Sequence, residues 1–113
     1  MKLFDKNCIH LDGRMDEPVW EQVQTYTGFK RLGTAEEVPA ERQTFFKIIP
    51  CEDRIFVGIK CMTENVEALK NAVAGSWGTP SVELFLSPSG NPYDFYQFFV
   101  GNKGARLALY YEE

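Results

Sequence analysis

The sequence lacks the segments that cross a membrane or direct a chain to export. Its longest apolar runs have the length of a β-strand, whereas a helix that spans a bilayer needs about 20 apolar residues. Residues 1–6 contain no apolar stretch of signal-peptide length. We therefore expect no membrane span and no signal peptide in this chain.

Positive charge is also scarce. Twelve Lys and Arg residues are scattered among sixteen Asp and Glu residues, and the formal net charge is −4. A nucleic-acid partner requires a basic stripe that displaces counterions from the phosphates. We therefore expect no nucleic-acid partner, and a neutral or cationic small ligand fits this composition better.

Cysteine is limited to three residues, too few for a convincing disulfide framework. Cys51 and Cys61 lie at opposite ends of a predicted hairpin arm. Ten residues of strand span about 33 Å, whereas bridged Cα atoms lie within about 7 Å of each other. Cys8 could form a disulfide with either of them only if the fold brought the two thiols together. The pattern predicts free, partly buried thiols.

Motifs for catalysis or tight metal binding are missing. Cys8, His10 and Asp12 would share one face of a strand predicted over 7–11, but no fourth ligand follows at matching spacing. The same Cys and His lack an orienting third group for nucleophilic catalysis. Adjacent carboxylates in an extended chain, such as Asp16 and Glu17, point apart and form no acid–base pair. We expect a protein that is not an enzyme.

Aromatic residues, by contrast, are abundant at 14%, and the chain is rich in β-forming runs. Later runs that predict strands lie at 44–49, 55–61, 81–86, 94–100 and 105–111. Asp16 to Trp20 predicts one helical turn, capped by Asp16, with Trp20 facing inward. Thr63 to Gly75 predicts a second short helix, and 33–42 a loop. The expected fold is all-β, an antiparallel β-sandwich with one or two short helices in a single domain, 1–113.

The hairpin of the last third predicts a ligand site. If its turn pairs Phe85 with Phe95, the antiparallel register sets Glu83 directly opposite Gln97. A carboxylate beside a carboxamide offers acceptors and donors at the spacing of vicinal sugar hydroxyls. The opposite face is expected in the core, and its members are Val82, Leu84, Phe98 and Val100.

Trp77 precedes this hairpin in a predicted loop, where its ring could stack on a pyranose. Simpler interpretations remain open for each residue. Trp77 could be a lid over the core, Glu83 a solvated strand residue and Gln97 a bridge between strands.

Four ordered blocks between residues 12 and 98 resemble the family 9 carbohydrate-binding modules. Asp12 to Trp20, Asp-Gly-Arg-Met-Asp-Glu-Pro-Val-Trp, is similar to the family's Asp-Gly-x-x-Asp-Glu-x-x-Trp opening, and Ile55-Phe56-Val57 to its Leu-Tyr-Val strand. Trp77 to Phe85 resembles the Trp-x-x-Asp-Ser-Val-Glu-Ile-Phe block. Gln97-Phe98 falls where the family has Gln-Phe.

The resemblance implies a non-catalytic β-sandwich that binds an oligosaccharide or the end of a polysaccharide, as an extracellular or cell-envelope appendage of a degrading enzyme. By position, Trp77 is similar to one of two tryptophans that sandwich the sugar, and Glu83 and Gln97 match polar positions near it. The resemblance also implies structural calcium as an option, although the residues alone show no compact acidic cluster that demands it.

The chain departs from the family pattern at several positions. Pro80 replaces the Asp before Ser-Val-Glu, and Phe99 and Gly101 stand where sugar-binding members have Arg and Asn. The family's second tryptophan lies in a C-terminal half absent here, which predicts a C-terminally shortened domain. These departures favour an alternative: a structural or protein-interaction sandwich that has lost sugar binding.

That alternative predicts that another chain covers the aromatic face. Separately, we expect another copy of the chain or a parent enzyme to cover the open C-terminal edge. Haem binding, known among sandwich relatives, is a third hypothesis. Met62 and His10 are its suggestive ligands.

Overall fold

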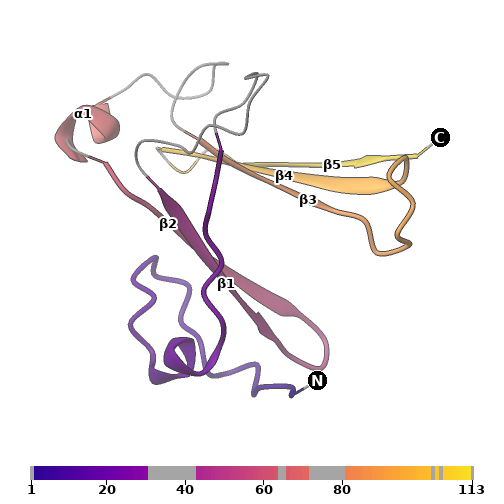
Figure 1. Cartoon of the computed structure of the whole chain (residues 1–113), viewed down its shortest axis with the longest axis horizontal. Helices are drawn as coiled ribbons and strands as arrows, with labels where there is room; N and C mark the ends of the chain where they lie inside the picture. The colour runs from indigo at the N-terminus through magenta and orange to yellow at the C-terminus, as the bar shows by residue number, and fades with distance from the viewer. Residues whose placement is uncertain are drawn as a thin grey trace. The chain divides into compact units, whose positions relative to one another are not determined.

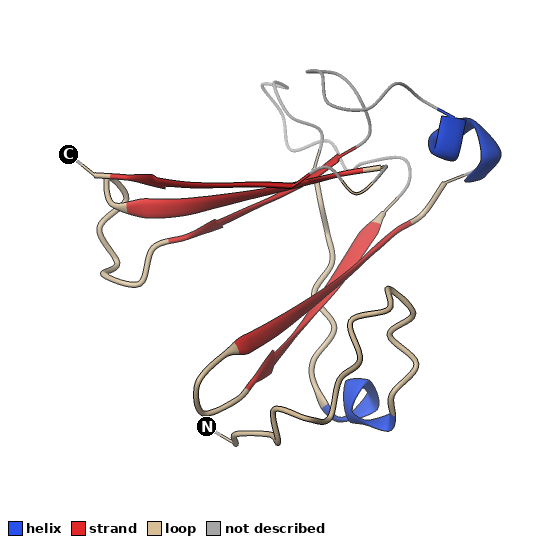
Figure 2. Ribbon diagram, turned by 180° about the vertical axis from the view of Figure 1, so that it is seen from behind, coloured by secondary structure: helices blue, strands red, loops and turns tan. Residues whose placement is uncertain are grey.

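Strands are the main regular elements of the molecule (Figure 2). The structure is a computed structural model and describes residues 2–30, 43–63, 66–71, 81–102, 104 and 106–112. Its strands form two antiparallel sheets, β1–β2 and β3–β4–β5. The helices described are a 3-10 helix, η1, and a short α-helix, α1. The all-β class and the expected short helices are therefore confirmed.

The chain divides into two compact units, Met1–Met62 and Thr63–Glu113. The first contains η1 (Pro18–Gln22), β1 (Thr44–Pro50) and β2 (Ile55–Cys61). The second contains α1 (Val66–Asn71), β3 (Ser81–Leu86), β4 (Phe95–Gly101) and β5 (Arg106–Tyr111) (Figure 1). The expectation of one domain over 1–113 stays a prediction.

The core of the first unit forms where η1 packs on the β1–β2 hairpin. Trp20 is 5% exposed and Ile49 is completely buried, with Val19 and Cys51 beside them. The inward position predicted for Trp20 is therefore confirmed. The helical turn itself begins at Pro18, whose fixed φ suits a first helical position. The residue before it is Glu17, so the prediction that Asp16 caps the turn is wrong.

The N-terminal segment does not form the strand predicted over 7–11. A tight turn occupies its start, because Cys8 N donates to Asp5 O at 3.0 Å and Asn7 N donates to Asp5 Oδ1 at 2.8 Å. The aspartate side chain thus offers the backbone a local partner in place of a strand ladder. The segment joins the hairpin at Phe4, which forms a parallel bridge with Cys51.

The three cysteines are free, as predicted. Cys51 follows β1 and is buried, whereas Cys61 lies at the other end of the hairpin, paired with Thr44, and is exposed. Cys8 is partly buried against the same core cluster as Cys51. Burial raises the pKa of the Cys51 thiol, because the apolar surroundings disfavour the thiolate.

The sheet of the second unit has the order β3–β4–β5. Its register differs from the predicted one by two residues, since Phe85 lies opposite Gln97 and Glu83 lies opposite Phe99. The reason is the connection after Leu86. It contains two consecutive turns, closed by Gly90 N to Ser87 O and by Asp94 N to Asn91 O, both at 3.1 Å. The direct pairing of Glu83 with Gln97 is therefore wrong, but a shift of two residues keeps both on one face.

The face predicted to lie in the core is not buried. Val82 and Leu84 are partly buried, while Phe98 is 37% exposed and Val100 is 49% exposed. In the described part of this unit, the six-residue helix α1 is the only regular element besides the sheet, so no second sheet layer covers this face there. The prediction of a core position is wrong for Phe98 and Val100, and it holds only in part for Val82 and Leu84.

Other sequence predictions fall partly outside the described residues. The predicted loop over 33–42 lies outside them, as does the predicted helix stop at Gly75. Within the predicted second helix, Val66 begins α1 and is 51% exposed. None of the helices described is long and apolar enough to span a membrane.

Candidate functional site

Glu83 and Gln97 lie side by side on one face of the β3–β4–β5 sheet. Gln97 Nε2 donates a hydrogen bond of 3.0 Å to Glu83 Oε1. The two residues are diagonal neighbours in the register, and long side chains can still meet across a diagonal. Glu83 is exposed and Gln97 is partly buried. The prediction that Glu83 and Gln97 share one face and lie side by side is therefore confirmed, although the predicted register was wrong.

Aromatic rings flank the pair on the same face. Phe85 lies opposite Gln97, and its ring centroid is 5.8 Å from that of Phe95. Phe95 in turn stacks on Tyr111 at 4.8 Å, with 28° between the ring planes. Phe85 is 55% exposed and Tyr111 is 42% exposed, so the row of rings forms part of the accessible surface.

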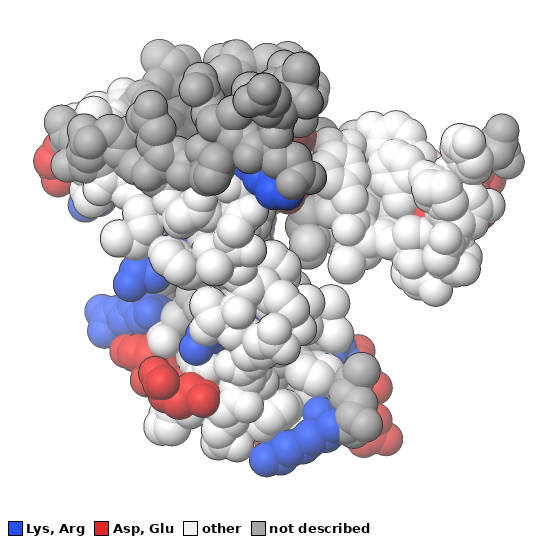
Figure 3. All heavy atoms as spheres, in the orientation of Figure 1, with Lys and Arg blue, Asp and Glu red and all other residues white. Residues whose placement is uncertain are grey.

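Apolar residues also border the pair on its other sides. Phe99 lies opposite Glu83, and Leu109 lies opposite Gln97. Few charged atoms of the described residues lie over the β3–β4–β5 sheet in the view of Figure 3. One carboxylate and one carboxamide are thus surrounded by apolar side chains. In small-molecule sites, such apolar side chains provide contact area and the few polar groups orient the ligand.

The pair is rich in hydrogen-bond acceptors. One N–H of Gln97 is used on Glu83, which leaves its second N–H and its carbonyl oxygen directed elsewhere. Within the described residues, neither Glu83 Oε2 nor Gln97 Oε1 accepts a hydrogen bond. These atoms could accept hydroxyl protons from a ligand, and the Gln97 amide could donate one hydrogen bond in return.

Trp77 and Pro80 lie outside the described residues. The two departures from the family pattern on β4 do lie within them. Phe99 is central on the Glu83 face, between Glu83 and Leu107, and Gly101 is buried opposite Ser81. At these two positions the sheet therefore offers an apolar ring and bare backbone instead of the polar groups of sugar-binding members.

The structure also brings together three carboxylates that the sequence analysis set aside. Oxygen atoms of Asp12, Asp16 and Glu17 lie within 4.8 Å of one another in the first unit. Two left-handed residues curl the segment between them, Gly13 at φ 78° and Met15 at φ 55°. The signal that could have found the cluster is the Asp-Gly turn at its start, because glycine favours this backbone conformation.

Nearby N–H groups already donate hydrogen bonds to two of these carboxylates, Glu17 and Asp12. Glu17 Oε2 accepts from His10 N at 3.0 Å and Glu17 Oε1 accepts from the Trp20 indole at 2.9 Å. Asp12 Oδ1 accepts from Arg14 N at 3.0 Å. The hydrogen bond from His10 N and, after it, the bond from the Trp20 indole lower the pKa of Glu17. The three residues could hold a hard cation, although Ca²⁺ takes six to eight oxygen ligands in proteins.

The residues considered for metal or haem binding are not brought together in this way. Cys8 packs against the core cluster, whereas His10 and Asp12 are exposed in the following loop. Met62 lines a cavity of the first unit, and His10 is not among the residues that line it. The geometry gives the hypothesis of haem ligation by His10 and Met62 no support.

The chain was compared with known proteins at the level of family, sequence and structure. No protein-family model matches it, and neither a curated protein nor a solved structure matches it at a significant level.

Proposed function

We propose that this protein is a non-catalytic carbohydrate-binding module that recognises a sugar through the exposed face of the β3–β4–β5 sheet. The observation that carries the proposal is the Gln97–Glu83 hydrogen bond on a face lined by exposed rings. The resemblance of the sequence to family 9 carbohydrate-binding modules points to the same residues.

The chemistry of the face suits a polyhydroxylated ligand. A sugar ring has an apolar side that packs on aromatic rings and a rim of hydroxyls that need acceptors. Phe85 and Tyr111 would supply the apolar contact, while Glu83 and Gln97 would orient the hydroxyls. The hydrogen bond between Glu83 and Gln97 fixes both side chains in advance, which reduces the entropy lost on binding.

Trp77 belongs to the proposal through the resemblance, as the stacking platform beside this pair. A glycan array of plant and bacterial oligosaccharides, probed with the wild-type protein and with Trp77→Ala, tests the proposal. We expect the wild type to select a defined set of glycans, and the variant to bind the same glycans more weakly while it remains folded by circular dichroism.

The control is Tyr93→Ala, which removes an exposed ring from the loop between β3 and β4. We expect its binding to equal that of the wild type. An array without reproducible binding would contradict the proposed function. Equal affinity of Trp77→Ala and wild type would remove Trp77 from the site.

A second candidate function is a protein-interaction module that has kept the fold without sugar binding. It is favoured by the other face of the same sheet, where Tyr96 and Tyr110 pack at 4.7 Å and are 42% and 53% exposed. Phe98 and Val100 extend this apolar surface. Apolar surface of this kind commonly marks contact with another chain. Light scattering separates the two functions, because a strict monomer that binds glycans contradicts the second.

A further inference from the structure

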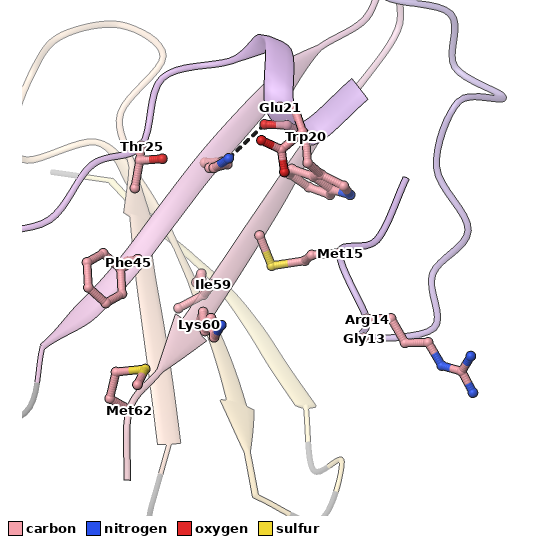
Figure 4. A pocket seen from close by; sticks show the side chains of 11 residues that line it. Gly13, Arg14, Met15, Trp20, Glu21, Thr25, Phe45, Ile59, Lys60 and Met62 are labelled. Atoms are coloured by element: carbon pink, nitrogen blue, oxygen red, sulfur yellow. Dashed lines mark hydrogen bonds between the residues drawn. The ribbon is translucent and has the colours of Figure 1, made fainter. Parts of the chain in front are cut away.

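The first unit contains a cavity of about 550 Å³ on one face of the β1–β2 hairpin (Figure 4). Phe45 and Lys47 of β1 and Lys60 of β2 contribute to it from the strands, because Phe45 pairs with Lys60 and Lys47 with Gly58 on a common face. Met15 and Trp20 contribute from the segment that packs over this face. Its volume lies within the range of about 300–1,000 Å³ typical of small-molecule pockets.

Gly58 makes this arrangement possible. A β-carbon at position 58 would lie 2.5 Å from Met15 Cε and 2.8 Å from Trp20 Cη2. The absence of a side chain therefore lets the thioether and the indole rest directly on β2. Together with Phe45 and Met62 they give the cavity an apolar wall. Thioethers adapt to the shape of an apolar ligand, and aromatic rings offer a flat surface on which it can stack.

The polar part of the lining is mainly cationic. Lys47 Nζ donates to the carbonyl oxygen of Trp20 at 2.7 Å, drawn as a dashed line in Figure 4. A neutral carbonyl positions the ammonium group without neutralising it, and two of its three N–H donors remain. Lys60 adds a second ammonium group, and within the described residues neither lysine forms an ion pair.

The charged residues that line the cavity favour a negatively charged ligand. Arg14 also lines the cavity, but Figure 4 shows its guanidinium directed away from the other side chains. Even without Arg14, the two lysines outnumber Glu21, the one acidic residue of the described lining, so the lining carries surplus positive charge in a chain whose net charge is −4. A ligand with a single negative charge and an apolar body complements this lining.

We propose that the cavity binds a small aromatic carboxylate. Its carboxylate would pair with the ammonium group of Lys60, and its ring would pack against Trp20, Met15 and Met62. Lys47 would add a second positive charge to the lining. The site lies within the first unit, whereas the proposed carbohydrate site lies within the second. A negative result for one proposal therefore does not contradict the other.

Methyl-labelled methionine gives a direct test, because two of the chain's three methionines line the cavity. The probes are 3-phenylpropionate, 3-phenylpropanol and 3-phenylpropylamine, which share a phenyl ring on a three-carbon chain and end in an anionic, a neutral and a cationic group. Variants Met15→Leu and Met62→Leu assign the two methyl signals. We expect 3-phenylpropionate to shift both signals in a saturable manner and to bind roughly tenfold more tightly than the alcohol, with the amine weakest.

The matched variants are Lys60→Gln, inside the cavity, and Lys2→Gln, outside its lining. We expect Lys60→Gln to weaken 3-phenylpropionate binding roughly tenfold without affecting the alcohol, and Lys2→Gln to change neither. The proposal is overturned if no probe shifts the two signals, if the three probes bind equally, or if Lys60→Gln binds the acid as the wild type does. Saturable binding of inorganic phosphate at the same signals with equal affinity would also contradict it.

Discussion

Gln97 and Glu83 are joined by a hydrogen bond of 3.0 Å although neither is the other's partner in the β-ladder. Phe99 takes the position opposite Glu83, and Phe85 the position opposite Gln97. The polar contact thus crosses the sheet diagonally between two aromatic residues. This relationship couples the positions of the Glu83 and Gln97 side chains. We therefore expect a ligand that binds one of them to contact the other.

The Glu83–Gln97 pair should show energetic coupling in glycan binding. We expect Glu83→Ala and Gln97→Ala each to weaken binding of an oligosaccharide selected on the array by roughly tenfold. The double variant should lose much less than the product of the two, because removal of one residue already disrupts the other's position. Isothermal titration calorimetry measures the cycle. Additive losses would contradict the coupling, and Glu67→Ala on α1 is the matched control for the loss of a carboxylate.

Gly58 is expected to be required for the packing of the first unit. Where space allows, Gly→Ala stabilises a chain by about 0.4–1 kcal/mol, because it restricts the unfolded state. At Gly58 the added carbon collides with Met15 and with the buried Trp20, so we expect destabilisation of about 1–3 kcal/mol instead. Urea unfolding measures the difference. Met15→Ala in the same chain should recover part of the loss, and a Gly58→Ala variant as stable as the wild type would refute this packing.

Glu17 predicts a pH dependence of stability. Hydrogen bonds from His10 N and from the Trp20 indole lower its pKa below the ordinary value of 4.5. A depressed pKa in the folded state contributes stability above pH 4.5, and that contribution is lost as the pH falls through the folded value. We expect the difference in melting temperature between wild type and Glu17→Gln to be largest near neutrality and to shrink below pH 4.5. A difference that grows on acidification would contradict this.

The cysteines should differ in reactivity. Cys61 is exposed, whereas Cys51 is 6% exposed and its pKa is raised by burial, so less thiolate is present and the reagent has less access. Treatment with iodoacetamide, followed by mass spectrometry of the peptides, should modify Cys61 first and Cys51 last. Cys61→Ser should remove the fast phase. Alkylation of Cys51 as fast as that of Cys61 would show that the core of the first unit is open.

The regular elements could be predicted from the sequence because their patterns are local. Alternating and β-rich runs located β1 to β5 within a residue. The segment Asp16 to Trp20 predicted a helical turn with a buried indole, and η1 begins two residues later, at Pro18. Phe98 and Val100 of the expected core face are exposed. Apolar side chains lie on both faces of β4, so alternation there could not distinguish an inner face from an outer one.

What could not be predicted depends on turns and on distant contacts. The register of β3 and β4 follows from two successive turns in one connection, whereas the predicted pairing of Phe85 with Phe95 differs from it by two residues. The acidic cluster depends on the left-handed backbone of Met15, which its residue type does not predict. The cavity required Gly58 and Trp20 to meet, a contact between residues far apart in the sequence.

The side-chain amide of Gln97 gives the most direct test of carbohydrate binding on this sheet. In an NMR titration of the uniformly ¹⁵N-labelled protein with a glycan selected on the array, its two Nε2 proton signals should shift together with the backbone amides of Phe85 and Tyr111. Glu83→Ala should abolish the shift of the Nε2 signals. If the glycan binds while these signals stay unchanged, the sugar lies elsewhere and the proposed site is wrong.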